Sequence, residues 1–587
     1  MYPSPGSPLT RWELWRIKQP QARHWGLGLR SPRSRTTGRA GPNGAQPGVS
    51  WMRKDGVIPG SVSTLLLHFR NTAGAVEPVD VLGRFGASLC GDHNDCLPGL
   101  AAAVADCLQT TLAIPLDREP GQKLQFADSE GLDGVAPHRR DFSLGSRFHS
   151  SRREKYGNVF KTHLLGRPLI RVTGSENVRK ILMGEHTLVS SQWPRSTRML
   201  LGSTSLINSI GDIHRQKRKI FAKVFSHYAL ECYLPKIQQA IQDGIRDWSS
   251  SGEPITVYHE AKKLTFRIAV RVLLGFRVSE TELNLLSESF EQLVANLFSL
   301  PLDFPFSGYR KGMRARDNLH KYLEKAISEK LQYKEEKDYS DAMDILIDSA
   351  REQGKELTMQ ELKESTVELI FAAFATTSSA TTSLIYQLLQ HPLVLEKLRE
   401  ELRSNGILHN GCKCEETPRM AVVVRLKYLD CIIKEVLRLL PPVSGGYRTA
   451  LQTFELDGCQ IPKGWSVLYS IRDTHDTAPI FQNSEVFDPD RFSEERGENK
   501  GDRFSYIPFG GGIRSCLGKE LAKLILKVLA MELASTSCFE LATRTFPSML
   551  TVPVVHPVDG LRVKFSGLDS NQNEIDPETE TMLGSTV

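Results

Sequence analysis

The sequence lacks any uninterrupted apolar run of about 20 residues, which is the length that a helix needs to cross a bilayer. The most apolar candidate, residues 97–116, is interrupted by Pro98, Asp106 and Pro115. We therefore predict that the chain has no membrane-spanning helix and no N-terminal membrane anchor. Attachment to a membrane surface, if any, is expected to be weak.

The ten cysteines lack the regular, even spacing of a disulfide framework. This pattern indicates a reducing compartment or a protein that faces the cytosol. Cys412 and Cys414 are separated by one residue in a polar loop, but no second ligand pair accompanies them. Zinc binding is therefore not expected at this pair.

Acidic residues are almost absent from positions 1–54, where Glu13 stands against ten Lys and Arg residues. The whole chain has 74 basic and 68 acidic residues. Residues 55–587 therefore have 64 basic and 67 acidic residues, a net charge of −3. Because residues 1–60 are also rich in Arg, Gly, Pro and Ser, we interpret 1–147 as a largely disordered extension, with 61–147 the more ambiguous part. A solvated tail is favoured over one that binds nucleic acid or anionic lipid.

Patterns after position 147 indicate one mainly helical domain with small β-sheets. Hydrophobic residues make up 40% of the chain and charged residues 24%, as in globular proteins. The turn at Gly166 predicts a strand–turn–strand unit, and Pro301, Pro305 and Gly308 predict a break between helices. Long helices are predicted over 358–390 and 428–440, and short strands over 453–457 and 467–471.

A glycine-rich segment near the C-terminal end holds one cysteine in the pattern Phe509-x-x-Gly512-x-Arg514-x-Cys516-x-Gly518. An amphipathic helix is predicted directly after it, because its charged residues form one polar stripe. The members of this stripe are Lys519, Glu520, Lys523 and Lys527. Cys516 is thus expected where a flexible bend meets a helix N-terminus.

The N–H groups and dipole of a helix N-terminus favour a thiolate at Cys516. Three adjacent glycines before it would let the backbone approach a large, flat group. A thiolate in such a position is the axial ligand with which a haem iron cleaves dioxygen, and Arg514 could reach a haem propionate. The alternative interpretation is a buried structural cysteine on a tight turn.

The Cys516 segment resembles the haem-binding motif of the cytochrome P-450 superfamily of haem-thiolate monooxygenases. Further segments are similar to its retinoic-acid hydroxylase family, namely 148–157, 193–199, 211–214, 556–560 and 567–574. The resemblance covers residues 148–587 and leaves 1–147 outside it. It implies the cytochrome P-450 fold, haem b as cofactor, and a haem domain that begins at position 148.

The resemblance also implies roles for charged residues around the haem. Glu435, Arg438 and Arg491 would form a buried structural network that fixes the haem-binding loop, and the first two share a helix face because they are three residues apart. Haem-binding positions carried over from the family are Phe509, Gly512, Arg514, Gly518, His214, Arg218 and Arg448.

The predicted helix over 358–390 contains Ala372-Ala-Phe-Ala-Thr-Thr377. By resemblance, Thr376 aligns with the threonine that helps to deliver protons to dioxygen. Ala373 replaces the usual glycine and Ala375 the usual acid, so the route of proton delivery stays open, with water or backbone carbonyls as substitutes. The alternative is that Thr376 is one of several small hydroxyl residues in a packed helix.

Substrate-pocket positions come from the resemblance alone, and ordinary core packing is the alternative for each. An aromatic, apolar pocket suits a long apolar ligand. Arg195 and Arg198 are candidate partners for a ligand carboxylate. The pocket positions are Trp193, Phe298, Phe371, Phe374 and Val443.

The activity implied by the resemblance is hydroxylation of all-trans-retinoic acid at its 4-position, which inactivates this lipid. Dioxygen and an NADPH-dependent flavoprotein reductase would take part, at the cytosolic face of the endoplasmic reticulum membrane. Basic residues in 214–219 and 519–527 are expected to steer the acidic reductase surface. The alternatives are a haem-thiolate isomerase, a sterol or fatty-acid hydroxylase, and a truncated, non-catalytic product that binds no haem.

Overall fold

The computed structural model describes residues 144–164, 167–332, 340–409, 412–413, 420–498 and 500–568. The predictions made for residues 1–143, including the disordered extension and the apolar segment 97–116, lie outside the described residues. So do Cys414 and the family-like residues 569–574. The first described helix begins at Leu144, just before the expected domain start at Phe148.

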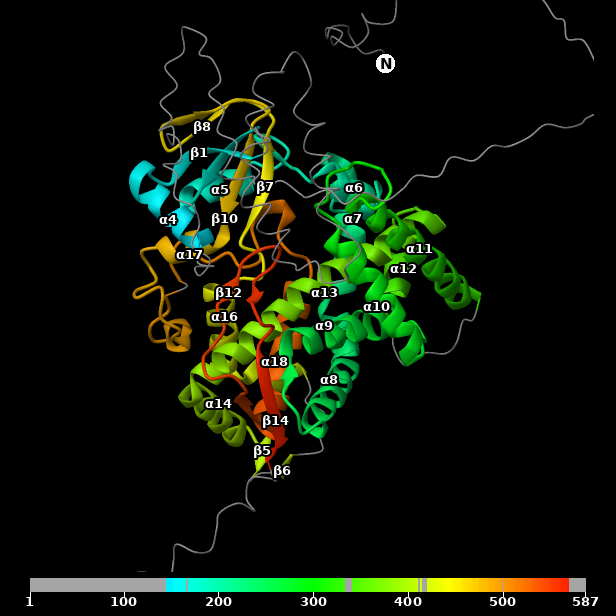
Figure 1. The fold of residues 1–587 in the computed structure, drawn as a ribbon, viewed down its shortest axis with the longest axis vertical. Helices are drawn as coiled ribbons and strands as arrows, with labels where there is room; N and C mark the ends of the chain where they lie inside the picture. The colour runs from blue at the N-terminus through cyan, green and yellow to red at the C-terminus, as the bar shows by residue number, and fades with distance from the viewer. Residues whose placement is uncertain are drawn as a thin grey trace, which may run out of the picture. The chain divides into compact units, whose positions relative to one another are not determined.

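The described part of the chain is mainly helical, as predicted (Figure 1). Its α-helices are α4 (Leu144–Tyr156), α5 (Ser175–Met183), α6 (Arg195–Leu201), α7 (Gly211–Ala222), α8 (His227–Ser250), α9 (Val257–Arg267), α10 (Glu280–Ala295), α11 (Gly308–Gln332), α12 (Ala342–Glu352), α13 (Met359–Gln390), α14 (Pro392–Ser404), α15 (Met420–Arg425), α16 (Lys427–Leu439), α17 (Ile471–Thr477) and α18 (Lys519–Thr536). Short helical turns of other pitch are η2 (Lys223–Phe225), η3 (Ile268–Leu273), η4 (Pro489–Phe492) and η5 (Gly512–Arg514).

A five-stranded sheet holds the N-terminal part of the described chain against its C-terminal half. The strand order is β1 (Val159–Leu164), β2 (Arg167–Val172), β10 (Ser466–Ser470), β7 (Gly445–Ala450) and β3 (Val189–Ser191). β1 and β2 are antiparallel, as predicted, whereas β2 and β10 are parallel. Val467 pairs with Ile170 on one side and with Arg448 on the other, so this sheet fixes the position of Arg448.

The remaining strands form small sheets. β11 (Ser537–Leu541), β14 (Arg562–Gly567) and β4 (Ile255–Thr256) make a three-stranded sheet. Two-stranded pairs are β5 (Leu408–His409) with β6 (Cys412–Lys413), β8 (Phe454–Leu456) with β9 (Cys459–Ile461), and β12 (Met549–Leu550) with β13 (His556–Pro557).

Helix α13 lies at the centre of the helical part and packs against α9, α11, α16 and α18. Thr358 begins it with a capping box, in which Thr358 Oγ1 accepts the Glu361 N–H and the Glu361 carboxylate accepts the Thr358 N–H. The helix ends at Gln390, before Pro392, as predicted. Among the described residues α13 is also long and apolar enough to span a membrane, but 67% of its apolar stretch is buried inside the protein, as in a core helix.

Candidate functional site

Cys516 lies in the short connection between η5 and α18. Its backbone N–H donates to Phe509 O at 3.0 Å, which closes the loop, and Gly518 caps α18. The thiol keeps accessible surface, yet burial by the surrounding protein raises its pKa. The Gly518 N–H, Arg218 and Lys519 all act to lower this pKa, but more weakly than burial raises it. The N–H group at the helix N-terminus therefore acts on the pKa of Cys516 in the expected direction, toward the thiolate.

The three glycines of the loop have different roles. A Cβ added to Gly512, which has φ +64°, would lie 2.2 Å from Leu182 O, and one added to Gly511 would lie 3.2 Å from the Leu182 side chain. These two glycines therefore allow close packing against the end of α5. Of the three, Gly510 alone has open space around an added Cβ.

Glu435, Arg438 and Arg491 form one buried network. The Glu435 carboxylate accepts hydrogen bonds from Arg438 Nε and Nη2 at 2.7 and 2.9 Å, and from Arg491 Nε at 2.9 Å. Both arginines also donate to backbone carbonyls, among them Val486 O, and Arg491 binds Glu498 at 2.7 Å. Every charge in the network has a partner, which is the condition for a buried ion network to be tolerated.

His475 links this network to the loop before Cys516 and was not identified from the sequence. The Ile507 N–H donates to His475 Nε2 at 2.9 Å, so Nδ1 carries the proton and donates to Arg438 O at 3.0 Å. Burial lowers the pKa of His475 to about 4, so the ring is neutral. His475 lies far from Arg438 and Ile507 in the sequence, so no local sequence pattern predicts these two contacts.

A second charged cluster gathers around Glu185, which sequence reasoning also missed. Arg514 Nε donates to Glu185 Oε1 at 2.7 Å, and Arg448 Nε lies 2.6 Å from Glu185 Oε2. Arg218, from α7, donates to Ser515 O at 2.6 Å. The structure thus brings two of the predicted haem-binding arginines together and attaches the third to the cysteine loop.

Several buried polar atoms in this region make no hydrogen bond within the part of the chain that the structure describes. His214 Nδ1 is one of them, and the close ion pair of Arg448 Nε with Glu185 lacks hydrogen-bond geometry. Burial lowers the pKa of His214 to about 4, so its ring is neutral. Donors of this kind fit an acidic group, as the carboxylates of a haem would supply beside a cysteine ligand. The residues present therefore fit a haem.

Thr376 lies on a face of α13 that is open in the middle of an otherwise buried helix. Its Oγ1 donates to Ala372 O at 2.7 Å, and Ala372 is exposed. Phe374, in contrast, is only 2% exposed and packs edge-to-face with Phe266 and Phe290. The helix period turns the Phe374 side chain into the core, which is the alternative that the sequence left open for this position.

The other predicted pocket residues are spread over several elements. Trp193 is half-buried before α6, Phe371 packs partly buried against the main core, and Phe298 is 59% exposed between α10 and α11. Val443 is 41% exposed, and both Arg195 and Arg198 are exposed on α6.

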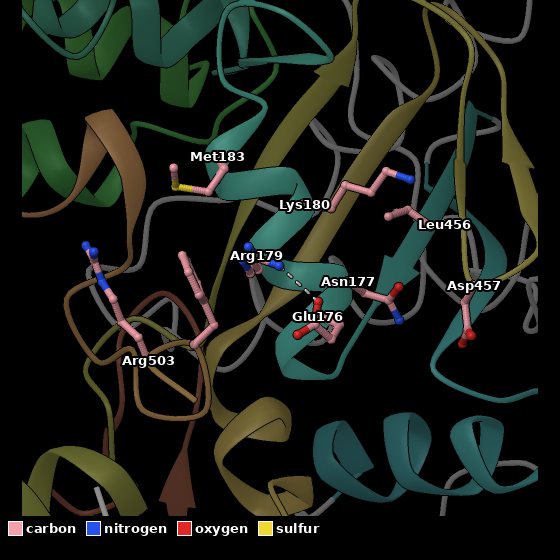
Figure 2. Close-up of a pocket in the computed structure, with 9 residues that line it drawn as sticks. Glu176, Asn177, Arg179, Lys180, Met183, Leu456, Asp457 and Arg503 are labelled. Atoms are coloured by element: carbon pink, nitrogen blue, oxygen red, sulfur yellow. Dashed lines mark hydrogen bonds and ion pairs between the residues drawn. The ribbon is translucent and has the colours of Figure 1, made fainter. Parts of the chain in front are cut away.

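A cavity of about 570 Å³ lies elsewhere, between α5 and the β8–β9 hairpin (Figure 2). Arg179, Lys180 and Asp457 line it, together with Arg503 and Phe504, and none of the predicted pocket residues does. Figure 2 shows Arg179 turned toward Glu176, with which it pairs at 3.3 Å. Five of the nine residues that line this surface recess are charged, whereas the predicted substrate pocket is aromatic and apolar.

Most of the basic residues that were expected to face a reductase have partners. His214 is neutral, and Lys217 Nζ donates to Thr204 O. The remaining ion pairs are Arg215 with Asp212, Lys523 with Glu520, and Lys527 with Asp430. Asp212 and Glu520 are sequence neighbours of their partners, whereas Asp430 comes from a distant segment, so the sequence does not show that Lys527 has an acidic partner.

Comparisons with known proteins agree with this geometry. The family model described as Cytochrome P450 matches residues 139–551. Cytochrome P450 26B1 of Xenopus tropicalis is 73% identical over 443 residues, and the human protein of that name is 71% identical over 444 residues; each alignment covers 76% of this chain and 87% of the relative. Human Cytochrome P450 26C1 is 58% identical over 443 residues, and this alignment covers 72% of this chain and 85% of the relative. A solved structure described as retinoic acid bound cyanobacterial CYP120A1 has a TM-score of 0.66 and 32% identity, and the match covers 72% of this chain and 96% of that one.

Proposed function

The chain belongs to the cytochrome P450 family, a family of haem-dependent monooxygenases, and we propose that it hydroxylates all-trans-retinoic acid at the 4-position and thereby inactivates it. The observation that carries this proposal is the Cys516 loop, closed by the Phe509 carbonyl and held by Arg218 through Ser515. The retinoic acid named for the cyanobacterial relative and the high identity to Cytochrome P450 26B1 support the substrate.

Bound haem supplies the redox and dioxygen chemistry that amino-acid side chains lack. Cys516 Sγ would hold the iron as a thiolate ligand, which would donate electron density to the metal. The buried ring of His214 and the terminal nitrogens of Arg448 and Arg514 would bind the propionates, while Glu185 contacts the Nε atoms of both arginines. Arg218 holds the loop that carries Cys516. The glycines at 512 and 518 and Phe509 shape the same loop.

Thr376 positions a proton on the open face of α13. Its own hydrogen is directed to Ala372 O, so its oxygen lone pairs remain available to accept from a water. Because Ala375 stands where the family has an acid, such a water would take the place of a carboxyl group as the proton source. The presence of Ala375 in place of an acid is also the observation that favours an isomerase, because an isomerase does not need protons delivered to dioxygen.

The electrons come from an NADPH-dependent flavoprotein reductase in this proposal. Residues of α7 and α18 that remain exposed, such as Lys219 and Lys519, face the solvent where such a partner can dock. We also propose that the protein acts at the cytosolic face of the endoplasmic reticulum membrane, where a membrane-soluble substrate is available.

Purified full-length chain provides the test. We expect a thiolate-type carbon-monoxide difference spectrum, and a 4-hydroxylated product from all-trans-retinoic acid that requires both NADPH and the reductase. Isomerisation of an organic peroxide without NADPH, together with no NADPH-dependent turnover of retinoic acid, would identify an isomerase. Turnover of a sterol or fatty acid but not of retinoic acid would reassign the substrate, and the absence of any thiolate-type band would identify a non-catalytic chain.

A further inference from the structure

Glu185 lies just after α5, and its carboxylate joins two segments that are far apart in the sequence. Oε1 accepts hydrogen bonds from Arg514 Nε at 2.7 Å and from the Ser191 N–H at 2.9 Å. Oε2 lies 2.6 Å from Arg448 Nε. The Glu185 side chain is only 1% exposed, so both guanidinium groups meet one carboxylate inside the protein.

The surroundings of Glu185 explain why a carboxylate is needed there. A buried carboxylate is costly unless cations and hydrogen bonds satisfy it, and here two arginines and one backbone N–H do so. The two cations are close enough that the charge of Arg448 acts to lower the pKa of Arg514. Without the anion between them, the two guanidinium groups would repel each other.

Each arginine keeps donor capacity beyond its contact with Glu185. Arg514 Nη2 donates to Ser209 O at 2.6 Å, and Arg448 Nη1 donates to Tyr447 O at 2.8 Å. Arg514 Nη1 and Arg448 Nη2 donate to no acceptor among the residues that the structure describes. Both guanidinium groups are therefore held by their Nε edges, with one terminal nitrogen each left for another anion.

We propose that Glu185 is a positioning residue for the haem: its carboxylate fixes Arg448 and Arg514 so that their remaining N–H groups receive the propionates. This inference rests on the proposed function, because it requires that haem is bound. Glu185 leaves the pair of arginines with a net charge of +1 instead of +2. Its removal would both loosen the arginines and add a positive charge beside the haem.

Two substitutions separate position from charge. Glu185→Gln keeps the shape of the side chain and removes its charge, whereas Glu185→Asp keeps the charge and shortens its reach. The matched control is Glu176→Gln on α5, because Glu176 is exposed and pairs with the exposed Arg179. All are prepared as full-length holoprotein.

Haem loss to an excess of haem-free globin and the ferric/ferrous reduction potential are measured for each variant. We expect Glu185→Gln to lose haem about 10–100-fold faster, as is typical when a residue that orients a ligand-holding group is removed. Its reduction potential should rise, because a lost negative charge favours the addition of an electron. Glu185→Asp should lose haem faster than wild type with a smaller change in potential, and Glu176→Gln should match wild type in both.

Unchanged haem loss and potential in Glu185→Gln would overturn the proposal. If that variant yields no holoprotein, Glu185→Asp decides: faster haem loss supports a positioning role, and wild-type haem loss overturns it. Faster haem loss in Glu185→Gln without any rise in potential would also overturn it, since it would indicate general loosening of the fold. Failure of the proposed function is distinct, because wild-type protein would then lack the thiolate-type carbon-monoxide band.

Discussion

Glu435 binds Arg438 through both of its carboxylate oxygens, at 2.9 Å for Oε1 and 2.7 Å for Oε2, and neither side chain is exposed. Oε1 also accepts from Arg491 and from the Asp488 N–H, each at 2.9 Å. One carboxylate therefore joins α16 to η4 and to the chain before it. His475 extends this connection toward the cysteine loop through Ile507.

Replacing Arg438 with Ala should prevent the accumulation of folded holoprotein. Glu435 would keep one cationic partner but lose two hydrogen bonds in a fully buried site, and breaking such a network costs about 3–5 kcal/mol. Yield and haem content per protein measure the effect. Arg403→Ala on α14 is the control, because its partners Glu396 and Glu400 are exposed and the cost should stay below about 1 kcal/mol. Normal haem content in Arg438→Ala would show that the network does not support the haem site.

Replacing Cys516 with Ser should abolish the thiolate-type carbon-monoxide band and monooxygenase turnover. A neutral hydroxyl does not supply the electron donation of a thiolate to iron. The control is Cys538→Ser in β11, a free and partly buried cysteine away from the loop, which should keep the wild-type spectrum. A Cys516→Ser protein that retained the thiolate-type band would contradict the assignment of the iron ligand.

Glu368 on α13 should make the stability of the protein depend on pH. Its carboxylate is buried and accepts the N–H groups of Leu206 and Ile207, at 2.7 and 2.6 Å, in the loop before α7. Burial raises its pKa from 4.5 to about 7. The folded state therefore binds this proton more tightly than the unfolded state, so the stabilisation is complete below pH 4.5 and is lost as the pH rises through 7.

Urea unfolding at several pH values measures this contribution. Relative to Glu368→Gln, the free energy of unfolding of wild-type protein should fall by about 3 kcal/mol as the pH rises through this range. Glu356→Gln, at an exposed position before α13, should follow the wild-type profile. Parallel pH profiles for wild type and Glu368→Gln would mean that Glu368 titrates as an ordinary carboxyl group.

Local patterns in the sequence were enough to predict the ends of α13 and the position of the cysteine loop. Thr358 and Pro392 set the ends of α13 through backbone hydrogen bonding within one turn, so neighbouring residues suffice to predict them. The roles of Glu185 and His475 were not predicted, because their partners Arg514 and Ile507 come from distant segments of the sequence. Such partners are decided by the packing of the whole chain.

The same limit applies to the orientation and pairing of side chains. Phe374 lies two residues from Thr376, and only the packing of α13 against α9 and α10 decides that it turns into the core. The partner of Lys527 could not be predicted for a similar reason. Asp430, which pairs with Lys527 at 2.9 Å, is almost a hundred residues away in the sequence.

Replacing Thr376 with Ala should uncouple NADPH consumption from product formation. The hydroxyl donates to Ala372 O and can accept from the water that supplies the proton, whereas a methyl group does neither. Proton delivery by a positioned group contributes at least about 100-fold to rate, so the yield of hydroxylated product per NADPH should fall strongly, with hydrogen peroxide formed instead. Thr376→Ser should restore coupling because it keeps the hydroxyl. Thr381→Ala on the same helix is the matched control, since the buried Thr381 hydroxyl has no hydrogen-bond partner among the described residues. Wild-type product yield per NADPH in Thr376→Ala would show that protons reach the site by a path that avoids this residue.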